Sequence, residues 1–231
     1  LLDIIIQLLS KDGVLIIEDP SLLECIKKVS YDQFYNEHIY VFSTLAVKNL
    51  ISKFGLVLFD IEKLDTHGGS LRYYIKSVNN KDLLIKKNVQ EQIKKEIDFG
   101  LGKFSTYKSF GNRTIVSKKK LLTIFKDIKS KKKIIIGYGA TAKATTVLNY
   151  CNIGDNIIDY FVDTTPDKTN RYMPGRKILI KKYNKRLVNK ADYIFLGAWN
   201  FKNEIFKKEK TFISNGGRFI THVPFPRIIN K

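Results

Sequence analysis

The second half of this chain alternates short apolar runs with helical segments, and this alternation constrains the fold more than any other feature. Runs rich in β-branched residues predict strands, and apolar residues spaced three and four apart predict the helices between them. Strands joined through helices lie parallel, with right-handed crossovers. Residues 113–231 are therefore expected to form a Rossmann-like, doubly wound α/β domain. The elements expected there are a helix at 118–131, a strand at 133–140, a helix at 141–152, a strand at 156–163, a loop at 164–176, a strand at 191–199, a helix at 200–217 and a strand at 218–223.

The first third of the chain follows a different order, which matches the closing half of an α/β sheet whose last two strands form an antiparallel pair. Residues 78–112 are polar and helical and predict a linker. The expected domains are therefore 1–77, 78–112 and 113–231. The elements expected in the first domain are the end of a helix at 1–12, a buried strand at 13–20, a helix at 43–55 capped by Ser43, and strands at 56–64 and 70–77.

The formal net charge of +19 would attract polyanions. The lysines are scattered through nearly every segment, and the joint abundance of Lys, Ile and Asn is typical of an AT-rich coding bias. We therefore expect neither nucleic acid nor a membrane as a partner, and no apolar run approaches the roughly 18 residues that span a bilayer. Cys25 and Cys151 are the only cysteines, too few for a disulfide framework or a cysteine zinc site, so we expect a cytoplasmic protein without a metal in this chain.

The sharpest chemical cluster is Tyr35, Glu37 and His38. It follows a strand ending in Glu18 and Asp19, and ligands of open α/β sheets gather beyond the carboxyl ends of strands. An imidazole beside a carboxylate and a phenol can abstract a proton from a carbon acid, because histidine acts as a base near neutral pH and a phenol can stabilise an oxyanion. The alternative is a half-buried histidine and tyrosine that serve packing alone.

The run HGGSLR at 67–72 is a second candidate. Gly68 and Gly69 permit positive φ angles and close approach of a ligand to the backbone, and Arg72 can pair with phosphate or carboxylate. The alternative is a hairpin turn followed by a surface arginine.

A third candidate is IIIGYGATAKA at 134–144, a strand followed by GxGxxA and the start of a helix. Such glycines let a helix N-terminus face an anion. Asp163 ends the next expected strand, where dinucleotide-binding domains hold the ribose, so an NAD(P)-dependent oxidoreductase is an alternative function. Lys143, at the start of the helix, instead favours a ligand phosphate without any nicotinamide.

A fourth candidate is the junction GAWNFKNEI at 197–205, where Trp199 and Asn200 lead from a strand into a helix. This junction and the third candidate lie at the same edge of the sheet if the strands are parallel. The alternative is that Asn200 caps the helix.

Taken together and in this order, the segments resemble the C-methyltransferases that act on nucleotide-linked keto-sugars. The family pattern is a strand ending in E-x-P, then YxEH, HGGSLR, GYGATAK, D-x-TPxKxxxYxPG and aWN. Each motif alone is weak, and the series is specific. The matching segments, which extend over essentially the whole chain, are Glu18–Pro20, Tyr35–His38, His67–Arg72, Gly137–Lys143, Asp163–Gly175 and Ala198–Asn200.

The resemblance implies transfer of a methyl group from S-adenosylmethionine to the sugar carbon next to a keto group. It implies that His38 is the base and that Tyr35 and Glu37 orient it. Glu18 and Asp19 are expected on the cofactor side. The residues expected on the side of the nucleotide-diphosphate sugar are His67, Gly68, Gly69, Ser70, Arg72, Lys143, Trp199 and Asn200.

Enzymes of this family have an N-terminal zinc-binding module, a central class I methyltransferase domain and a C-terminal α/β domain. The resemblance implies that this chain starts inside the central domain, just before its fifth strand. Zinc and the glycine-rich cofactor loop would then belong to a missing part, and the fragment would bind the cofactor poorly. A non-catalytic module that recognises sugar nucleotides is a further alternative.

Overall fold

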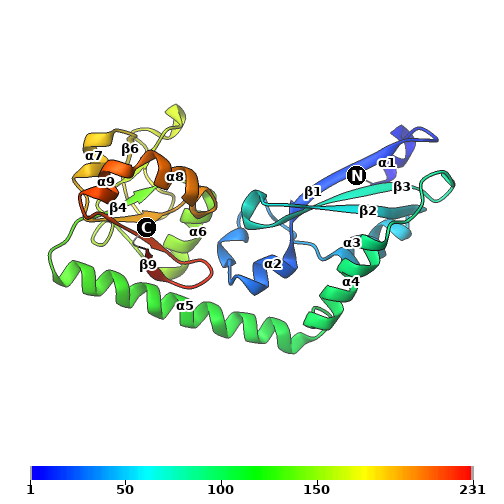
Figure 1. Ribbon diagram of the computed structural model, residues 1–231, viewed down its shortest axis with the longest axis horizontal. Coiled ribbons are helices and arrows are strands. Elements are labelled where there is room, and N and C mark those ends of the chain that lie inside the picture. Colours follow the sequence, from blue (N-terminus) through cyan, green and yellow to red (C-terminus); the bar gives the residue numbers. More distant parts are fainter. Residues whose placement is uncertain (1, 230–231) are drawn as a thin grey trace. The chain divides into compact units, whose positions relative to one another are not determined.

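The computed structural model describes residues 2–229, which divide into two compact units (Figure 1). Unit 1 comprises the described residues up to Lys27 together with Tyr40–Ser109. Unit 2 comprises Lys28–Ile39 together with the described residues from Phe110 onward. A short segment from the first part of the chain, Lys28–Ile39, thus belongs to the second unit. The domain division at 1–77, 78–112 and 113–231 stays a prediction.

Unit 1 is built on a three-stranded sheet in which β3 lies between β1 and β2 and runs antiparallel to both. The predicted antiparallel pair at 56–64 and 70–77 is confirmed. The strand at 13–20 is not buried as predicted, because among the described strands β1 pairs with β3 alone, and Ile16 is 54% exposed. The strands are β1 (Val14–Pro20), β2 (Leu56–Leu64) and β3 (Ser70–Ser77).

The helices of unit 1 cover this sheet through a core that includes Ile51, Tyr73 and Ile75. Ser43 accepts a hydrogen bond from the Ala46 amide at 3.1 Å and so caps α3 as predicted. The Glu96 side chain of α4 is buried, and its carboxylate accepts hydrogen bonds from two amides at the start of α3, those of Thr44 at 2.9 Å and Leu45 at 3.2 Å. Negative charge is favoured at this end of a helix. The helices are α1 (Leu2–Leu8), α2 (Leu22–Lys27), α3 (Thr44–Ser52) and α4 (Lys87–Phe99), with the 3-10 helix η2 (Thr66–Gly68).

A single helix, α5 (Phe104–Ser130), contains most of the segment 118–131, where we expected a separate helix to begin at 118. That expectation was wrong because Gly111 lowers helix propensity by only about 1 kcal/mol and the segment contains no proline. The buried side chains of α5 in unit 2 include Leu121, Phe125 and Ile128, which are at most 1% exposed. The helix therefore forms part of the core of unit 2.

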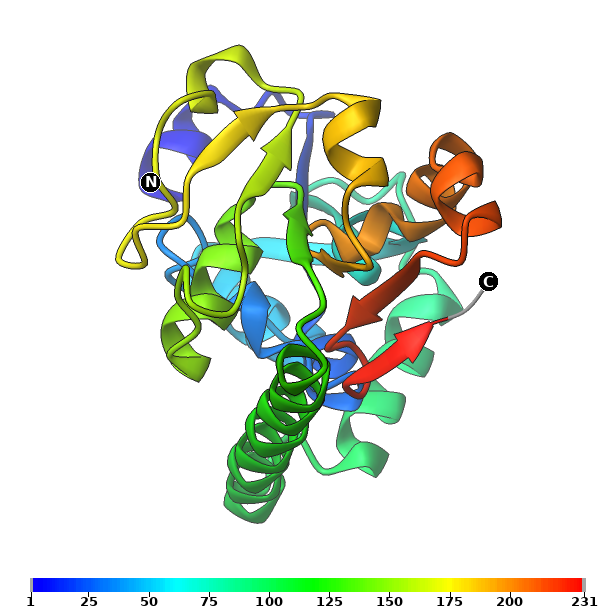
Figure 2. The ribbon, with the colours of Figure 1, turned by 90° about the vertical axis from the view of Figure 1, so that its left-hand side faces the viewer.

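Unit 2 contains a six-stranded sheet in the order β6-β5-β4-β7-β8-β9, in which β4 to β8 are parallel. The predicted doubly wound α/β arrangement is confirmed. The antiparallel β9, red in Figure 2 beside β8, was not predicted, and neither was β6. The strands are β4 (Ile135–Tyr138), β5 (Phe161–Asp163), β6 (Ile180–Lys182), β7 (Tyr193–Leu196), β8 (Arg218–Thr221) and β9 (Arg227–Ile229).

The strand order of unit 2 reverses between β4 and β7, because the chain moves outward through β5 and β6 and then returns to the other side of β4. In α/β sheets ligands collect at the carboxyl ends of the strands near such a switch point. The GYGATAK and GAWN junctions both follow strands that meet there, as predicted.

The helices of unit 2 lie on both faces of the sheet. The predicted helix at 200–217 is divided into two at Glu209, a residue that is 2% exposed and accepts hydrogen bonds from the hydroxyls of Tyr138 at 2.9 Å and Tyr183 at 2.8 Å. The helices are α6 (Ala142–Cys151), α7 (Lys185–Asn189), α8 (Lys202–Lys208) and α9 (Lys210–Ser214), with the 3-10 helices η1 (Tyr31–Gln33), η3 (Pro166–Lys168) and η4 (Trp199–Phe201).

Within residues 2–229, no helix has both the length and the apolar character needed to cross a bilayer. The same residues contain no group of three histidine, cysteine or acidic side chains that could hold a metal ion. Cys25 and Cys151 are buried and form no disulfide.

Candidate active site

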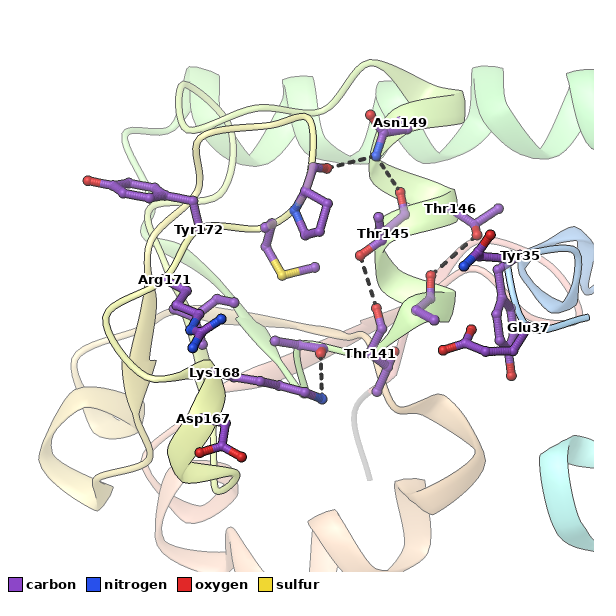
Figure 3. A pocket seen from close by; sticks show the side chains of 16 residues that line it. Tyr35, Glu37, Thr141, Thr145, Thr146, Asn149, Asp167, Lys168, Arg171 and Tyr172 are labelled. Carbon is purple, nitrogen blue, oxygen red and sulfur yellow. Dashed lines mark hydrogen bonds between the residues drawn. The ribbon is translucent and has the colours of Figure 1, made fainter.

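A cavity of about 700 Å³ lies in unit 2 between helix α6 and the loop that joins β5 to β6 (Figure 3). Its volume is in the range of pockets that bury a small organic ligand. The helix side is formed by hydroxyl and amide side chains, among them Thr145 and Asn149, and the loop side carries the cations Lys168 and Arg171. The segment Lys28–Ile39 completes the lining.

Tyr35 and Glu37 line this cavity, as Figure 3 shows, and His38 adjoins it through Tyr35. The Tyr35 hydroxyl lies 3.2 Å from His38 Nε2, and the two rings have centroids 4.2 Å apart. On the other side of the imidazole, His38 Nδ1 lies 3.0 Å from the Gln33 carbonyl oxygen. A carbonyl oxygen only accepts hydrogen bonds, so Nδ1 carries a proton and the neutral ring presents the lone pair of Nε2 to the Tyr35 hydroxyl.

Lys143 is the other predicted residue that the structure brings to this cluster. Its side chain, 6% exposed, starts from the first turn of α6, and its Nζ lies 5.5 Å from the centroid of the Tyr35 ring. Tyr35, Glu37, His38 and Lys143 therefore form one group within unit 2. The positive charge of Lys143 beside the Tyr35 ring would stabilise negative charge on the Tyr35 oxygen or on a ligand oxyanion hydrogen-bonded to that oxygen.

The predicted packing alternative for Tyr35 and His38 explains only part of this geometry. Tyr31 and Gln33 of the same segment are buried, 7% and 1% exposed, whereas Tyr35 and His38 are partly exposed and Glu37 is exposed. The core residues of the segment thus precede the polar group that borders the cavity.

Asp163 does end the strand after the GYGATAK turn, as predicted, but its carboxylate binds the protein's own backbone. Oδ2 accepts the Ala140 amide at 2.7 Å, Oδ1 accepts the Thr165 amide at 2.8 Å, and Lys168 lies 3.8 Å from Oδ2. Burial acts to raise the pKa of Asp163, but these hydrogen bonds and the charge of Lys168 hold it below its ordinary value. The ribose contact that the oxidoreductase alternative requires therefore has no support.

We expect the Asp163→Asn variant to lose about 1–3 kcal/mol of stability at pH 7, because an amide cannot accept both backbone N–H groups equally well. The folded-state pKa of Asp163 is lowered, so its stabilising contribution is present above the ordinary pKa of 3.8 and is lost as the pH falls through the folded value. Urea unfolding at pH 7 and under acidic conditions measures both effects. Asp155→Asn, at an exposed position, is the control. A variant as stable as the wild-type protein at pH 7 would refute this assignment.

Gly139 of the GYGA turn allows the turn after β4 to pack closely against the turn after β7. Gly139 has a φ angle of +82°, and a Cβ at this position would lie 2.7 Å from Ala198 Cβ. A Cβ on Gly197 would lie 2.3 Å from the Gly139 carbonyl oxygen. The turns after β4 and β7 are therefore in close contact, and neither Gly139 nor Gly197 can be replaced by a residue with a side chain without a steric clash.

Trp199 and Asn200 lie in η4, in the turn after β7. The Trp199 indole N–H donates a hydrogen bond to Asp32 Oδ2 at 2.5 Å, within unit 2. The residue at the N-cap of α8 is Phe201, and it makes no side-chain capping bond, so the alternative that Asn200 caps this helix is wrong. Substrate contacts of Trp199 and Asn200 stay predictions.

The remaining predicted residues form a second group, in unit 1. Arg72 bridges two carboxylates across the sheet, Glu18 at 3.1 Å and Glu62 at 3.0 Å, as the register of the three strands allows. Asp19 follows Glu18 and lies opposite Leu71 in the register of β1 and β3. The assignment of Glu18 and Asp19 to the cofactor, and of Arg72 to the substrate, stays a prediction.

The HGGS run forms the turn between β2 and β3. His67, Gly68 and Gly69 have φ angles of +53°, +85° and +132°, which confirms that this turn needs the freedom of glycine. The Ser70 hydroxyl closes the turn by donating to the Thr66 carbonyl at 3.1 Å. Substrate binding by His67–Ser70 stays a prediction.

Sequence reasoning missed the cationic wall of the cavity. Lys168 and Arg171 lie on the loop after β5, where Lys168 Nζ donates a hydrogen bond to the Ala140 carbonyl at 2.9 Å. The signal was present in the TPDKTNRYMPG motif, which was recognised for the family but not assigned to a site. Without the fold, nothing indicated that this loop faces α6 and Tyr35.

Comparisons with known proteins show the family of this chain. A family model described as the C-methyltransferase C-terminal domain matches residues 65–224. The chain is 32% identical over 223 residues to the C-methyltransferase NovU of Streptomyces niveus, and the alignment covers 96% of this chain. It covers 53% of NovU, so the chain spans about half the length of this relative.

Proposed function

Because the chain belongs to the C-methyltransferase family, we propose that it is the substrate-processing part of an S-adenosylmethionine-dependent enzyme that methylates a nucleotide-linked keto-hexose at the carbon next to the keto group. The observation that carries this proposal is the hydrogen-bonded pair of Tyr35 and His38 at the edge of the cavity. The segments that match the family pattern supply the substrate class. The reaction belongs to the complete protein.

The chemistry requires a base, since the hydrogen on a carbon next to a keto group is a weak acid. His38 is suited to this role because the Gln33 carbonyl fixes the proton on Nδ1 and leaves the lone pair of Nε2 available. Tyr35 lines the cavity and its hydroxyl lies 3.2 Å from Nε2, so the proton reaches His38 either directly or through this hydroxyl. The Tyr35 hydroxyl can also donate a hydrogen bond to the enolate oxygen that develops.

Substrate binding is assigned to the cavity in unit 2. Lys168 and Arg171 provide positive charge for the diphosphate, and Thr145, Thr146 and Asn149 offer hydrogen bonds to hydroxyl groups of a sugar. Lys143, which is buried beside Tyr35, would stabilise negative charge on the enolate side.

S-Adenosylmethionine would supply the electrophilic methyl group. Glu18 and Asp19 are the residues of this chain proposed to contact it, and the Glu18 carboxylate is already held by Arg72 and by the Thr66 hydroxyl at 3.1 Å. This geometry fits an orienting role at the end of β1 rather than a complete cofactor site. Zinc in a further N-terminal module is likewise a proposal that rests on the family pattern.

A methyl-transfer assay tests the proposed function. The full-length protein is incubated with S-adenosylmethionine and a panel of 4-keto hexose nucleotides, and the product is identified by the mass of one added methyl group. Transfer to a sugar carbon is the expected result. Full-length protein that binds none of the nucleotide sugars and transfers no methyl group would overturn the proposal.

The cavity is tested separately by titrating the chain with a nucleoside-diphosphate hexose. We expect Arg171→Ala to raise the Kd about tenfold, because a charged hydrogen bond to phosphate is lost. Arg218→Ala removes the same charge from an exposed position at the amino end of β8, the opposite edge of the sheet, and should leave the Kd unchanged. An equal rise in Kd for both substitutions would show that Arg171 affects binding only through the overall positive charge of the chain and not through contact with the ligand.

The two alternative functions lack a supporting observation. The oxidoreductase alternative needs a dinucleotide at the GYGATAK turn, where Gly139 touches Ala198 and Asp163 binds backbone amides. A module without catalysis gives no reason for an imidazole that lies between the Gln33 carbonyl and the Tyr35 hydroxyl at the edge of a cavity.

A further inference from the structure

Asp32 lies at the centre of a fully buried polar cluster in unit 2. Its carboxylate and the imidazole of His222 are both 0% exposed, and His222 Nε2 lies 3.3 Å from Asp32 Oδ2. The same oxygen accepts the Trp199 indole N–H at 2.5 Å. Three segments that are distant in the sequence meet here: η1, the turn after β7 and the residue after β8.

Burial of this polar cluster lowers the stability of unit 2, which suggests that the cluster serves another purpose than packing. Asp32 Oδ1 and both imidazole nitrogens of His222 are buried and have no hydrogen-bond partner among the described residues. Burying a carboxylate and an imidazole with some polar atoms unsatisfied costs stability, and apolar residues of similar size often serve as well. The aromatic side chains around His222, with Tyr31 at 5.7 Å and Phe195 at 5.9 Å between ring centroids, show that the surroundings are otherwise apolar.

A short covalent path links Asp32 to the proposed base. Gln33, the next residue, is 1% exposed, and its carbonyl oxygen is the acceptor for His38 Nδ1 at 3.0 Å. His38 Nε2 then meets the Tyr35 hydroxyl at 3.2 Å, at the edge of the cavity. The direction of the Gln33 carbonyl therefore decides which nitrogen of His38 carries the proton.

We propose that Asp32, held by the Trp199 indole and packed beside His222, is a positioning residue that fixes the Gln33 carbonyl and through it the tautomer and orientation of His38. The effect of Asp32 on catalysis rests on the proposed function, whereas its effect on the His38 tautomer can be tested separately. Trp199, expected from the sequence to bind substrate, acts here through Asp32. Neither Asp32 nor His222 was a candidate from the sequence, because their pairing depends on segments separated by nearly the whole of unit 2.

The first test reads the tautomer of His38 directly. The chain has three histidines, so long-range proton–nitrogen spectra of the imidazoles at mildly alkaline pH resolve into few signals, and His38→Gln identifies the signal of His38. In the wild-type chain we expect the tautomer with the proton on Nδ1. Asp32→Ala should change it to a mixture of tautomers, and Asp32→Asn, which keeps an oxygen acceptor for the Trp199 N–H, should restore it in part.

Glu209→Gln is the matched control, because Glu209 is a carboxylate of unit 2 that is equally buried and accepts hydrogen bonds from two tyrosines that lie outside the Lys28–Ile39 segment. It should leave the His38 signal unchanged. If Asp32→Ala does not fold, Trp199→Phe removes the same hydrogen bond and keeps the aromatic ring. A folded Asp32→Ala or Trp199→Phe variant whose His38 tautomer matches that of the wild type would overturn the proposal.

The second test uses turnover of the full-length protein. A misplaced base lowers the rate of the chemical step more than substrate binding, so we expect kcat to fall about 10- to 100-fold in Asp32→Ala while KM for the sugar nucleotide changes less than about threefold. Asp32→Asn should recover part of kcat. An equal loss of kcat in Glu209→Gln would reduce Asp32 to a structural residue. If the wild-type protein transfers no methyl group, the proposed function fails, and the tautomer test still decides the positioning role.

Discussion

Replacing His38 by alanine in the full-length protein is expected to lower kcat for methyl transfer by about 10³-fold or more and to change nucleotide-sugar affinity by less than about twofold. The imidazole is held between the Gln33 carbonyl and the Tyr35 hydroxyl, so its removal eliminates the proton acceptor. The charged groups on the loop of the cavity, Lys168 and Arg171, remain in place. Steady-state kinetics and isothermal titration of the same sample measure the two quantities.

Tyr35→Phe separates direct from relayed proton transfer. If the proton passes through the hydroxyl, the loss of kcat should approach that of His38→Ala. If His38 acts directly, the variant should lose only the hydrogen bond to the enolate, about 10- to 100-fold. Turnover at the wild-type rate in His38→Ala would remove this residue from the role of base.

Replacing Gly197 by alanine is expected to have the largest effect on stability, a loss of about 3 kcal/mol in the free energy of unfolding. The new Cβ would lie 2.3 Å from the Gly139 carbonyl oxygen and 2.9 Å from Ala144 Cβ. The first of these is a backbone atom next to β4, so the turns after β4 and β7 must move apart. Urea unfolding followed by circular dichroism measures the loss.

Gly111→Ala is the matched control for this substitution. Gly111 lies within α5, no atom lies within 4 Å of a Cβ built there, and alanine favours the helix. This variant should therefore gain about 0.5–1 kcal/mol. Similar stability of Gly197→Ala and the wild-type chain would mean that the two turns are not in close contact.

The elements that follow from a local pattern were predictable. The strand and helix around GYGATAK are fixed by a β-branched run, by two glycines and by the Thr141 cap, which accepts the Ala144 amide at 3.1 Å. The turn of His67–Gly69 was predictable because glycine allows positive φ. The three-residue strands β6 and β9 were missed because their residues become strands only by pairing with β5 and β8.

The candidate site was predictable to a smaller extent. Tyr35, Glu37 and His38 are neighbours in the sequence, so their chemistry could be recognised together. The cavity that they border depends on Lys168 and Arg171, more than 120 residues further along the chain. Asp163 was placed correctly at the end of its strand, but its partners, the amides of Ala140 and Thr165, could not be read from the pattern.

The sequence by itself determined the order of the strands β4, β5, β7 and β8 and the turns that need glycine, because each depends on residue types within a few positions of one another. The family followed from a series of such local motifs along the chain. The tertiary structure alone decided that Lys28–Ile39 joins the second unit, that the Trp199 indole donates a hydrogen bond to Asp32 and that His222 lies beside the same carboxylate. These contacts join residues up to 190 positions apart, and such pairs are selected by the burial and hydrogen bonding of the whole unit rather than by local propensity.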